Sequence, residues 1–244
     1  MSVYYNEIDK YCAQWLQNLM DAGEIPRGVI DTRSIEDVTP ADLTGFTQCH
    51  FFAGLGGWAL ALRLAGWPDS RSAWTGSCPC QPFSAAGKGA GFADERHLWP
   101  AWQYLIAQCR PAVVFGEQVK AATDWLKLVV SDLEGMGYAV GCCPIEAACA
   151  GAKHKRDRLW FVADTEWHQQ PRGESRIWPA GRMGRIEQSI PWDTSWESAL
   201  GALRVVGDGV QRCVEATDAC RNAIVPQAAQ AFIESYCEAR ELIS

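Results

Sequence analysis

Residues 51–57, Phe-Phe-Ala-Gly-Leu-Gly-Gly, decide the fold because they lead from a predicted strand into a predicted helix through a glycine-rich turn. Residues 48–52 predict the strand, and residues 58–65 predict the helix. Glycines at such a turn let a ligand lie against the backbone at a helix N-terminus, as in nucleotide-binding folds. By itself the turn is equally compatible with a tight connection that binds nothing.

Strand-like and helix-like segments alternate on both sides of this turn. Strands are predicted at residues 3–5, 48–52, 72–75, 112–115 and 138–142. Helices are predicted at residues 9–22, 58–65, 98–109, 122–136 and 222–242. This alternation predicts an α/β domain with a mainly parallel sheet. Residues 165–198 are rich in Trp, Arg, Gly and Pro without either period, which indicates an irregular insert or a small second lobe.

The composition is that of a soluble globular enzyme. Of the 244 residues, 48% are hydrophobic and 21% are charged, and no apolar run approaches the roughly 18 residues that a membrane span needs. We therefore expect a cytoplasmic, monomeric protein. The eleven cysteines show no zinc-ligand spacing, which predicts that no metal is bound.

The charge pattern leaves room for a nucleic-acid partner. The net charge of −7 argues mildly against one, since phosphate contacts draw on Lys and Arg. Residues 151–185, however, hold eight basic side chains against four acidic ones. This local excess is a possible binding surface, and on charge alone it is equally compatible with a solvated face.

A second informative stretch is residues 78–84, Cys-Pro-Cys-Gln-Pro-Phe-Ser. A cysteine between a proline and a polar residue is unusual for a core thiol, so Cys80 is a candidate nucleophile. The glycine-containing residues 85–96, with Lys88 among them, are typical of a loop that closes over a substrate. The competing interpretation is a surface loop with an incidental cysteine.

Together these segments resemble the DNA cytosine-5 methyltransferase family. Residues 52–57 resemble its motif I and residues 79–84 its motif IV. Residues 117–119 (Glu-Gln-Val) resemble motif VI, residues 154–158 (His-Lys-Arg-Asp-Arg) motif VIII, and residues 221–226 (Arg-Asn-Ala-Ile-Val-Pro) motif X. Five matches in family order are hard to attribute to chance. Gln118, His154 and Arg221 depart from the asparagine, glutamine and glycine of the family pattern.

The resemblance implies a Rossmann-like fold that uses S-adenosylmethionine, and a chemistry that suits the residues. Cys80 would add to C6 of cytosine, Glu117 would hydrogen-bond to or protonate N3, and Arg158 would hold O2, so that C5 can take the methyl group. The target base would be flipped out of duplex DNA. The residues that the resemblance assigns to catalysis are Cys80, Glu117, Arg158 and Arg156. Those that it assigns to the cofactor are Phe52, Gly54, Leu55, Gly56, Gly57 and Asn222.

Only 22 residues separate Gly57 from Cys80, where the family normally has two further strands. Residues 5–11 resemble the missing motif II, and residues 34–38 resemble motif III. We infer a permuted order in which Glu7 binds the ribose, Ile8 lies beside it, and either Ser34 or Asp31 contacts the adenine. The alternative is an N-terminal extension that merely packs on the sheet.

These inferences divide the chain into a catalytic cofactor-binding part (residues 1–164), a small target-recognition region (165–200) and a returning C-terminal segment (201–244). The side chains expected to touch DNA are Gln81, Ser84, Lys88, Arg172, Arg176, Arg182 and Arg185. Three alternatives stay open: a cytosine-5 methyltransferase acting on RNA, an idle DNA-binding decoy, and transfer of a different one-carbon group. The sequence does not indicate the recognition site.

Overall fold

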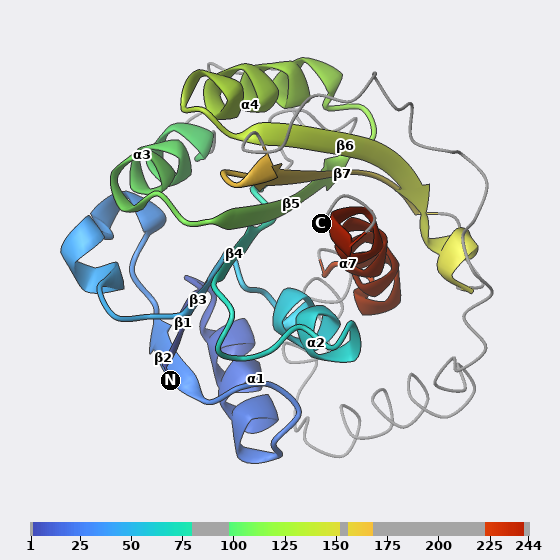
Figure 1. Cartoon of the computed structure of the whole chain (residues 1–244). Coiled ribbons are helices and arrows are strands. Elements are labelled where there is room, and N and C mark those ends of the chain that lie inside the picture. The colour runs from blue at the N-terminus through green and yellow to red at the C-terminus, as the bar shows by residue number, and fades with distance from the viewer. Residues whose placement is uncertain (1, 80–97, 152–155, 168–222, 242–244) are drawn as a thin grey trace.

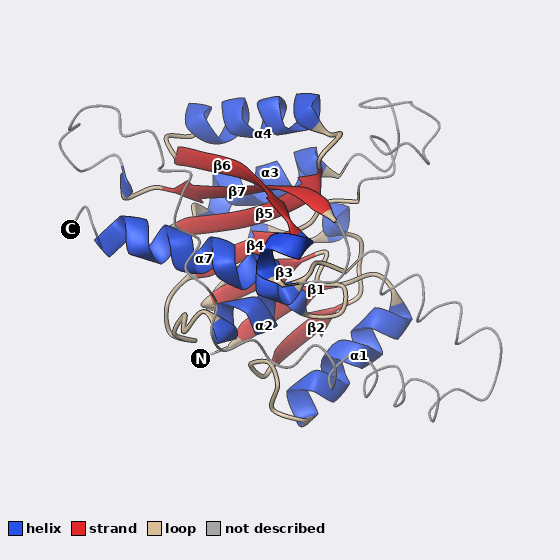
Figure 2. Ribbon diagram, turned by 90° about the vertical axis from the view of Figure 1, so that its right-hand side faces the viewer, coloured by secondary structure: helices blue, strands red, loops and turns tan. Residues whose placement is uncertain are grey.

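A seven-stranded sheet with helices on both faces forms the body of the protein (Figures 1 and 2). The computed structural model describes residues 2–79, 98–151, 156–167 and 223–241. The strand order is β2-β1-β3-β4-β5-β7-β6; the first five strands are parallel, and β7 is antiparallel to both neighbours. The predicted mainly parallel α/β fold is confirmed, and it is Rossmann-like. No helix within these four ranges is long and apolar enough to cross a membrane.

The elements match most of the predicted segments. The strands are β1 (Val3–Asn6), β2 (Gly28–Asp31), β3 (Gln48–Phe51), β4 (Ala73–Gly76), β5 (Val113–Val119), β6 (Ala139–Glu146) and β7 (Asp157–Asp164). The helices are α1 (Lys10–Asp21), α2 (Gly57–Leu64), α3 (Trp99–Cys109), α4 (Thr123–Gly135) and α7 (Pro226–Glu241). Short 3-10 helices are η1 (Ile35–Asp37), η2 (Pro40–Leu43) and η4 (Ala147–Ala150).

Two strands, β2 and β7, have no counterpart among the predicted segments. β2 has four residues at the sheet edge, which is too short a stretch to show a period. β7 carries the uninterrupted apolar run 159–163 because it lies between β5 and β6 with both faces covered. β5 and β6 also extend several residues beyond the predicted ends.

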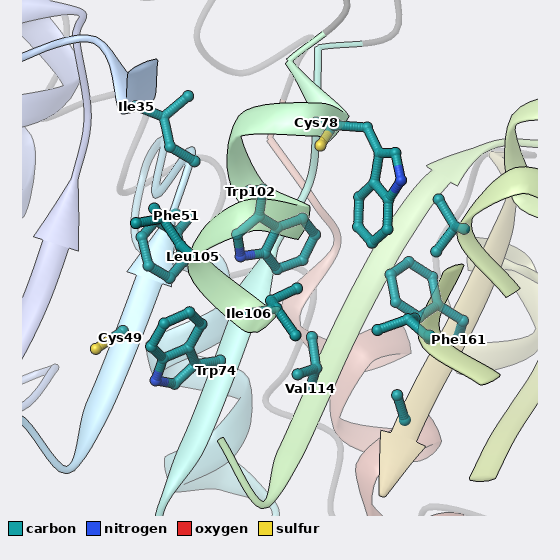
Figure 3. Packing of buried hydrophobic residues seen from close by; sticks show 14 of the residues in the cluster. Ile35, Cys49, Phe51, Trp74, Cys78, Trp102, Leu105, Ile106, Val114 and Phe161 are labelled. Atoms are coloured by element: carbon teal, nitrogen blue, oxygen red, sulfur yellow. The ribbon is translucent and has the colours of Figure 1, made fainter. Parts of the chain in front are cut away.

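Alternating side chains divide the core into two layers. On β7, Phe161 and Ala163 join the cluster under α3 and α4, whereas Trp160 and Val162 join the cluster under α2 and α7. The first cluster is rich in aromatic rings, and Figure 3 shows Trp102 of α3 beside Phe51. Burial of large rings on both faces holds the central strands rigid, so their carboxyl ends provide fixed positions for functional groups.

The N-terminal segment is an integral part of the sheet. β1 lies between β2 and β3, in register from Val3 opposite Gln48 to Asn6 opposite Phe51. The Asn6 side-chain amide donates to the Asp31 carbonyl at 3.3 Å and to the Arg33 carbonyl at 2.9 Å, which ties the end of β2 to β1. The residue after β1 therefore lies beside the glycine turn after β3.

At the end of β2, Asp31 forms a polar cluster that should make stability depend on pH. Its carboxylate accepts from Tyr4 Oη at 2.7 Å and from Arg33 Nη2 at 2.6 Å, and the Arg33 bonds, with smaller contributions, lower the pKa of Asp31 to about 2. A depressed folded-state pKa stabilises the fold above the ordinary pKa of about 4, and this stabilisation is lost as pH falls toward 2.

We predict that Asp31→Asn lowers the free energy of unfolding by about 1–2 kcal/mol at pH 7, because charge-assisted hydrogen bonds are lost. The difference from the wild type should shrink between pH 4 and pH 2. Urea unfolding at several pH values measures it, with the exposed Glu24→Gln as control. A difference that stays constant over this range would contradict the assignment.

Candidate functional site

A cavity of about 550 Å³ lies at the carboxyl ends of β1, β3, β4 and β5. Ligands of parallel α/β sheets bind at this edge because the loops after the strands converge there. Glu7, Gly54, Ser77 and Glu117 each follow or end one of these four strands and line the cavity. Arg158 reaches the same edge because β7 is antiparallel and begins where β5 ends.

The glycine turn forms one wall of the cavity. Gly54 and Gly56 have φ values of +54° and +78°, which lie in a backbone region that favours glycine. Phe52, which is not a glycine, also has a positive φ, of +51°. A Cβ on Gly57 would lie 2.6 Å from Ile224 Cγ1, so this glycine permits the close approach of residues 223–224. Of the five predicted residues of this turn, Phe52, Gly54, Leu55 and Gly57 line the cavity, whereas Gly56 does not and lies against Leu16.

Glu7 braces that turn. Its Oε2 accepts a hydrogen bond from the Gly54 backbone N–H at 2.6 Å, and its Oε1 accepts one from the Asp9 N–H at 2.8 Å. The residue is 8% exposed, and burial raises the pKa of the Glu7 carboxyl while the two backbone donors lower it. Each carboxylate oxygen has a second lone pair, so Glu7 can hold the turn and still accept from a ligand.

Next to Glu7 the cavity offers an apolar surface and a polar rim. Ile8 lines the cavity with 66% of its surface exposed, so it presents an apolar side chain to a ligand. Ser34 and Arg33, which follow β2, also line the cavity, whereas Asp31 does not and is bound to Arg33 and Tyr4. Of the two candidates left open by the sequence, the geometry favours Ser34.

Glu117 and Arg158 form a buried ion pair at the other end of the cavity. Arg158 Nε lies 2.6 Å from Glu117 Oε1, with side chains 20% and 8% exposed. Burial raises the pKa of Glu117, and Arg158 and then Arg156 oppose this shift. Within the described residues no well-directed hydrogen bond reaches Oε1. A buried acceptor in this condition is suited to a donor brought by a ligand.

The segment leading to Cys80 follows β4, which lies between β3 with its glycine turn and β5 with Glu117. Ser77, Cys78 and Pro79 line the cavity, and the Gln118 amide donates to the Cys78 carbonyl at 3.3 Å. Burial raises the pKa of the Cys78 thiol, which keeps that cysteine neutral. Cys80 itself lies outside the described residues, as do Gln81, Ser84 and Lys88.

The chain returns to the cavity after the region that the sequence assigns to target recognition. Arg156 Nη2 donates to the Ala223 carbonyl at 2.8 Å, and Ala223 and Ile224 line the cavity. The remaining site predictions, Asn222, Arg172, Arg176, Arg182 and Arg185, and the departures His154 and Arg221, lie outside the described residues. In the part of the chain that is described, no group of three or more His, Cys, Asp and Glu side chains could hold a metal.

Several cavity residues lie outside the predicted site, among them Arg33, Trp58 and Ser77. Ser77 had a signal, because it lies two residues after the predicted strand 72–75 and a residue at the carboxyl end of a parallel strand faces this edge. No sequence signal pointed to Arg33, since its position in the cavity depends on β2, which was not predicted. Trp58 reads as an ordinary apolar helix residue until its indole N–H is seen to bond to Ser77.

Comparison with known proteins adds a sequence-level result. Residues 68–181 match the family model of the C-5 cytosine-specific DNA methylases. The chain is 35% identical over 98 residues to the Type II methyltransferase M.AplI of Arthrospira platensis, covering 38% of this chain and 28% of that protein. It is 28% identical over 218 residues to the Type II methyltransferase M.NgoBI of Neisseria gonorrhoeae, covering 83% and 58%. The chain thus spans less than two thirds of these relatives.

Among solved structures, the S. pombe Dnmt2 methyltransferase aligns over 72% of this chain and 53% of that one, with a TM-score of 0.44 and 13% identity. That likeness is too low to support the fold assignment, which rests on the strand order and pairing.

The Glu117–Arg158 pair leads to a stability prediction. Arg158→Met removes the counter-charge and raises the pKa of Glu117 further, so the ionised carboxylate becomes costly to bury. We expect a loss of about 3 kcal/mol at pH 8 that narrows as the pH falls toward 5, because lower pH favours the neutral form of the variant's Glu117.

Urea unfolding at both pH values measures this loss. Lys127→Met is the control, because its ion pair with Asp124 is more than three-quarters exposed and should contribute little. Equal destabilisation by Arg158→Met at pH 5 and pH 8 would show that Glu117 is not the group involved.

Proposed function

We propose that this chain, whose residues 68–181 match the family model of the C-5 cytosine-specific DNA methylases, belongs to the DNA cytosine-5 methyltransferase family and transfers a methyl group from S-adenosylmethionine to carbon 5 of cytosine in double-stranded DNA. One observation carries the proposal. A single cavity is lined by the glycine turn, by the Glu117–Arg158 pair and by Pro79, the residue before Cys80. A methyl donor and a cytosine bound in it would meet beside the nucleophile segment.

The residues at the β1 and β3 side of the cavity fit S-adenosylmethionine. Backbone groups of the turn at Gly54 can approach a ligand closely, Glu7 can accept from ribose hydroxyls, and Ile8 offers an exposed apolar surface to a flat ring. Ser34 can hydrogen-bond at the ring edge. The cofactor would supply an activated methyl group. In this assignment β1 and β2 are the ribose and adenine strands, placed before the glycine turn in the permuted order.

At the base end, each residue has a defined task. The Cys80 thiolate adds through sulfur to C6, the C5–C6 electron pair moves to form a C4–C5 double bond, and the C4–N3 pair moves onto N3, where Glu117 donates a hydrogen bond or a proton. Arg158 holds O2 and stabilises Glu117. C5 takes the methyl group, and loss of the C5 proton restores the C5–C6 double bond and expels the sulfur.

The remaining expectations concern DNA. Stacking shields C6 in a duplex, so the base must be flipped at a cost of roughly a few kcal/mol, and the segment after Cys80 is the proposed clamp. Arg172, Arg176, Arg182 and Arg185 are proposed phosphate or base contacts within residues 165–200. The chemistry at the base would be the same for an RNA cytosine, so a transfer RNA substrate is included in the test below.

We predict that Cys80→Ser abolishes methyl transfer and that Cys78→Ala retains it, because the Cys78 thiol is buried and neutral. A duplex containing 5-fluorocytosine should form a covalent adduct with the wild type and with Cys78→Ala, but not with Cys80→Ser. Isotope-labelled methyl groups should appear as 5-methylcytosine in duplex DNA and not in transfer RNA. An adduct that forms with Cys80→Ser and is lost in Cys78→Ala would show that Cys78, and not Cys80, is the nucleophile.

The assignment of the N-terminal strand has its own test. Glu7→Ala removes a charge-assisted acceptor and the brace of Gly54, so the affinity for S-adenosylhomocysteine should fall roughly tenfold to a hundredfold. Glu7→Gln keeps one acceptor oxygen, so its affinity for S-adenosylhomocysteine should lie between those of the wild type and Glu7→Ala. Calorimetric titration of folded protein measures the effect, with Glu24→Ala as an exposed control. Wild-type affinity in a folded Glu7→Ala variant would leave the N-terminus with a packing role only.

A further inference from the structure

A hydrogen-bonded chain of three side chains links the helix after the glycine turn to Glu117. Trp58 is the second residue of α2 and is 3% exposed. Its indole Nε1–H donates to Ser77 Oγ at 3.1 Å. Ser77 lies beside Glu117, because the preceding residues Gly76 and Gly116 are register partners on β4 and β5, and both side chains line the cavity. Hydrogen bonding by the Ser77 side chain is one of the influences that lower the pKa of Glu117. Three elements, α2, the end of β4 and β5, are therefore joined at the base-proximal end of the cavity.

The chemistry of the three groups sets the direction of these bonds. An indole N–H can only donate, so it occupies a lone pair of the Ser77 oxygen. An ionised carboxylate can only accept, so a hydrogen bond between Ser77 and Glu117 must use the single Ser77 hydroxyl hydrogen. The chain runs from Trp58 through Ser77 to Glu117, and each bond polarises the next in the same sense.

Packing keeps the first member of the chain in place. The Trp58 ring lies against Phe115 with centroids 6.2 Å apart and against Trp160 at 5.5 Å in an edge-to-face arrangement. Phe115 precedes Glu117 by two positions on β5, and Trp160 follows Arg158 by two positions on β7. The indole is therefore held by the same two strands that carry the ion pair.

We propose that Ser77, oriented by Trp58, is a positioning residue that aims the Glu117 carboxyl group at the target base and couples it to the helix that begins at the cofactor turn. This inference rests on the proposed function, because it concerns the same site. It assigns a task to two cavity residues that the five sequence motifs do not explain.

Other charged groups facing Glu117 determine what removal of Ser77 should do. Arg158 and Arg156 stabilise the ionised form, and burial, the largest influence, opposes it. The Cys78 thiol beside Ser77 stays neutral, and Trp58 and Gln118 carry no charge. The Ser77 bond lowers the pKa of Glu117, so its loss should move the titration of Glu117 to higher pH.

Ser77→Ala and Trp58→Phe form a matched pair of tests, since the first removes the hydroxyl and the second removes only the N–H from a retained aromatic ring. We expect Ser77→Ala to slow single-turnover methyl transfer at pH 7 roughly tenfold, the equivalent of one charge-assisted hydrogen bond. The limb of the pH–rate profile that Glu117→Gln removes should shift to higher pH. Trp58→Phe should shift it in the same direction by less. Ser235→Ala, an exposed hydroxyl on α7, is the control.

A second readout is independent of activity. The ¹³C resonance of the Glu117 carboxyl group, assigned by its loss in Glu117→Gln, should titrate at higher pH in ligand-free Ser77→Ala than in the wild type. An unshifted resonance in folded Ser77→Ala would overturn the inference, whatever the rate. A shifted resonance in a protein whose wild type transfers no methyl group would sink the proposed function and leave the hydrogen-bonded chain in place.

Discussion

The hydrogen bond from the Gly54 backbone N–H to Glu7 joins two segments that are 47 residues apart, and the cavity depends on it. It exists only because β1 pairs with β3 in a register that sets Asn6 opposite Phe51. A shift of one residue would turn every side chain of β1 to the other face of the sheet. The rings of Tyr4 and Tyr5, buried on opposite faces, oppose such a shift. Packing of the N-terminal strand thus positions the acid that shapes the turn.

The opposite end of the cavity depends on a second constraint, a carboxylate buried at the end of β5. Three groups favour the ionised form of Glu117: Arg158 on β7, Arg156 just before β7, and Ser77 just after β4. None of these groups is close in sequence to Glu117. Burial that raises its pKa places a carboxyl group where it can change protonation state during proton transfer, which is a common property of catalytic acids and bases. The same burial reduces stability at neutral pH.

Much of the architecture could be predicted from residue patterns, and the reasons for the failures are physical. The helices and five strands show clear periods, so their existence and approximate bounds were predictable. β2 is too short to show a period, and β7 is apolar on both faces. Glu117 and Arg158 were predictable from a resemblance and are paired in the structure, while Ser77, Trp58 and Arg33 enter the cavity only through long-range packing. The choice between Ser34 and Asp31 likewise required the Asp31–Arg33 contact to be seen.

In the proposed complex, one cavity holds the methyl donor at the β1–β3 side and the base at the β4–β5 side. A crystal structure of the full chain with S-adenosylhomocysteine would show whether the donor binds there. We predict that the ribose hydroxyls lie within hydrogen-bonding distance of Glu7, that the adenine contacts Ile8 and Ser34, and that the sulfur lies over the turn at Gly54 and points toward Glu117. Density for the ligand elsewhere, or a ribose bound by another acid while Glu7 contacts only Gly54 and Asp9, would contradict it.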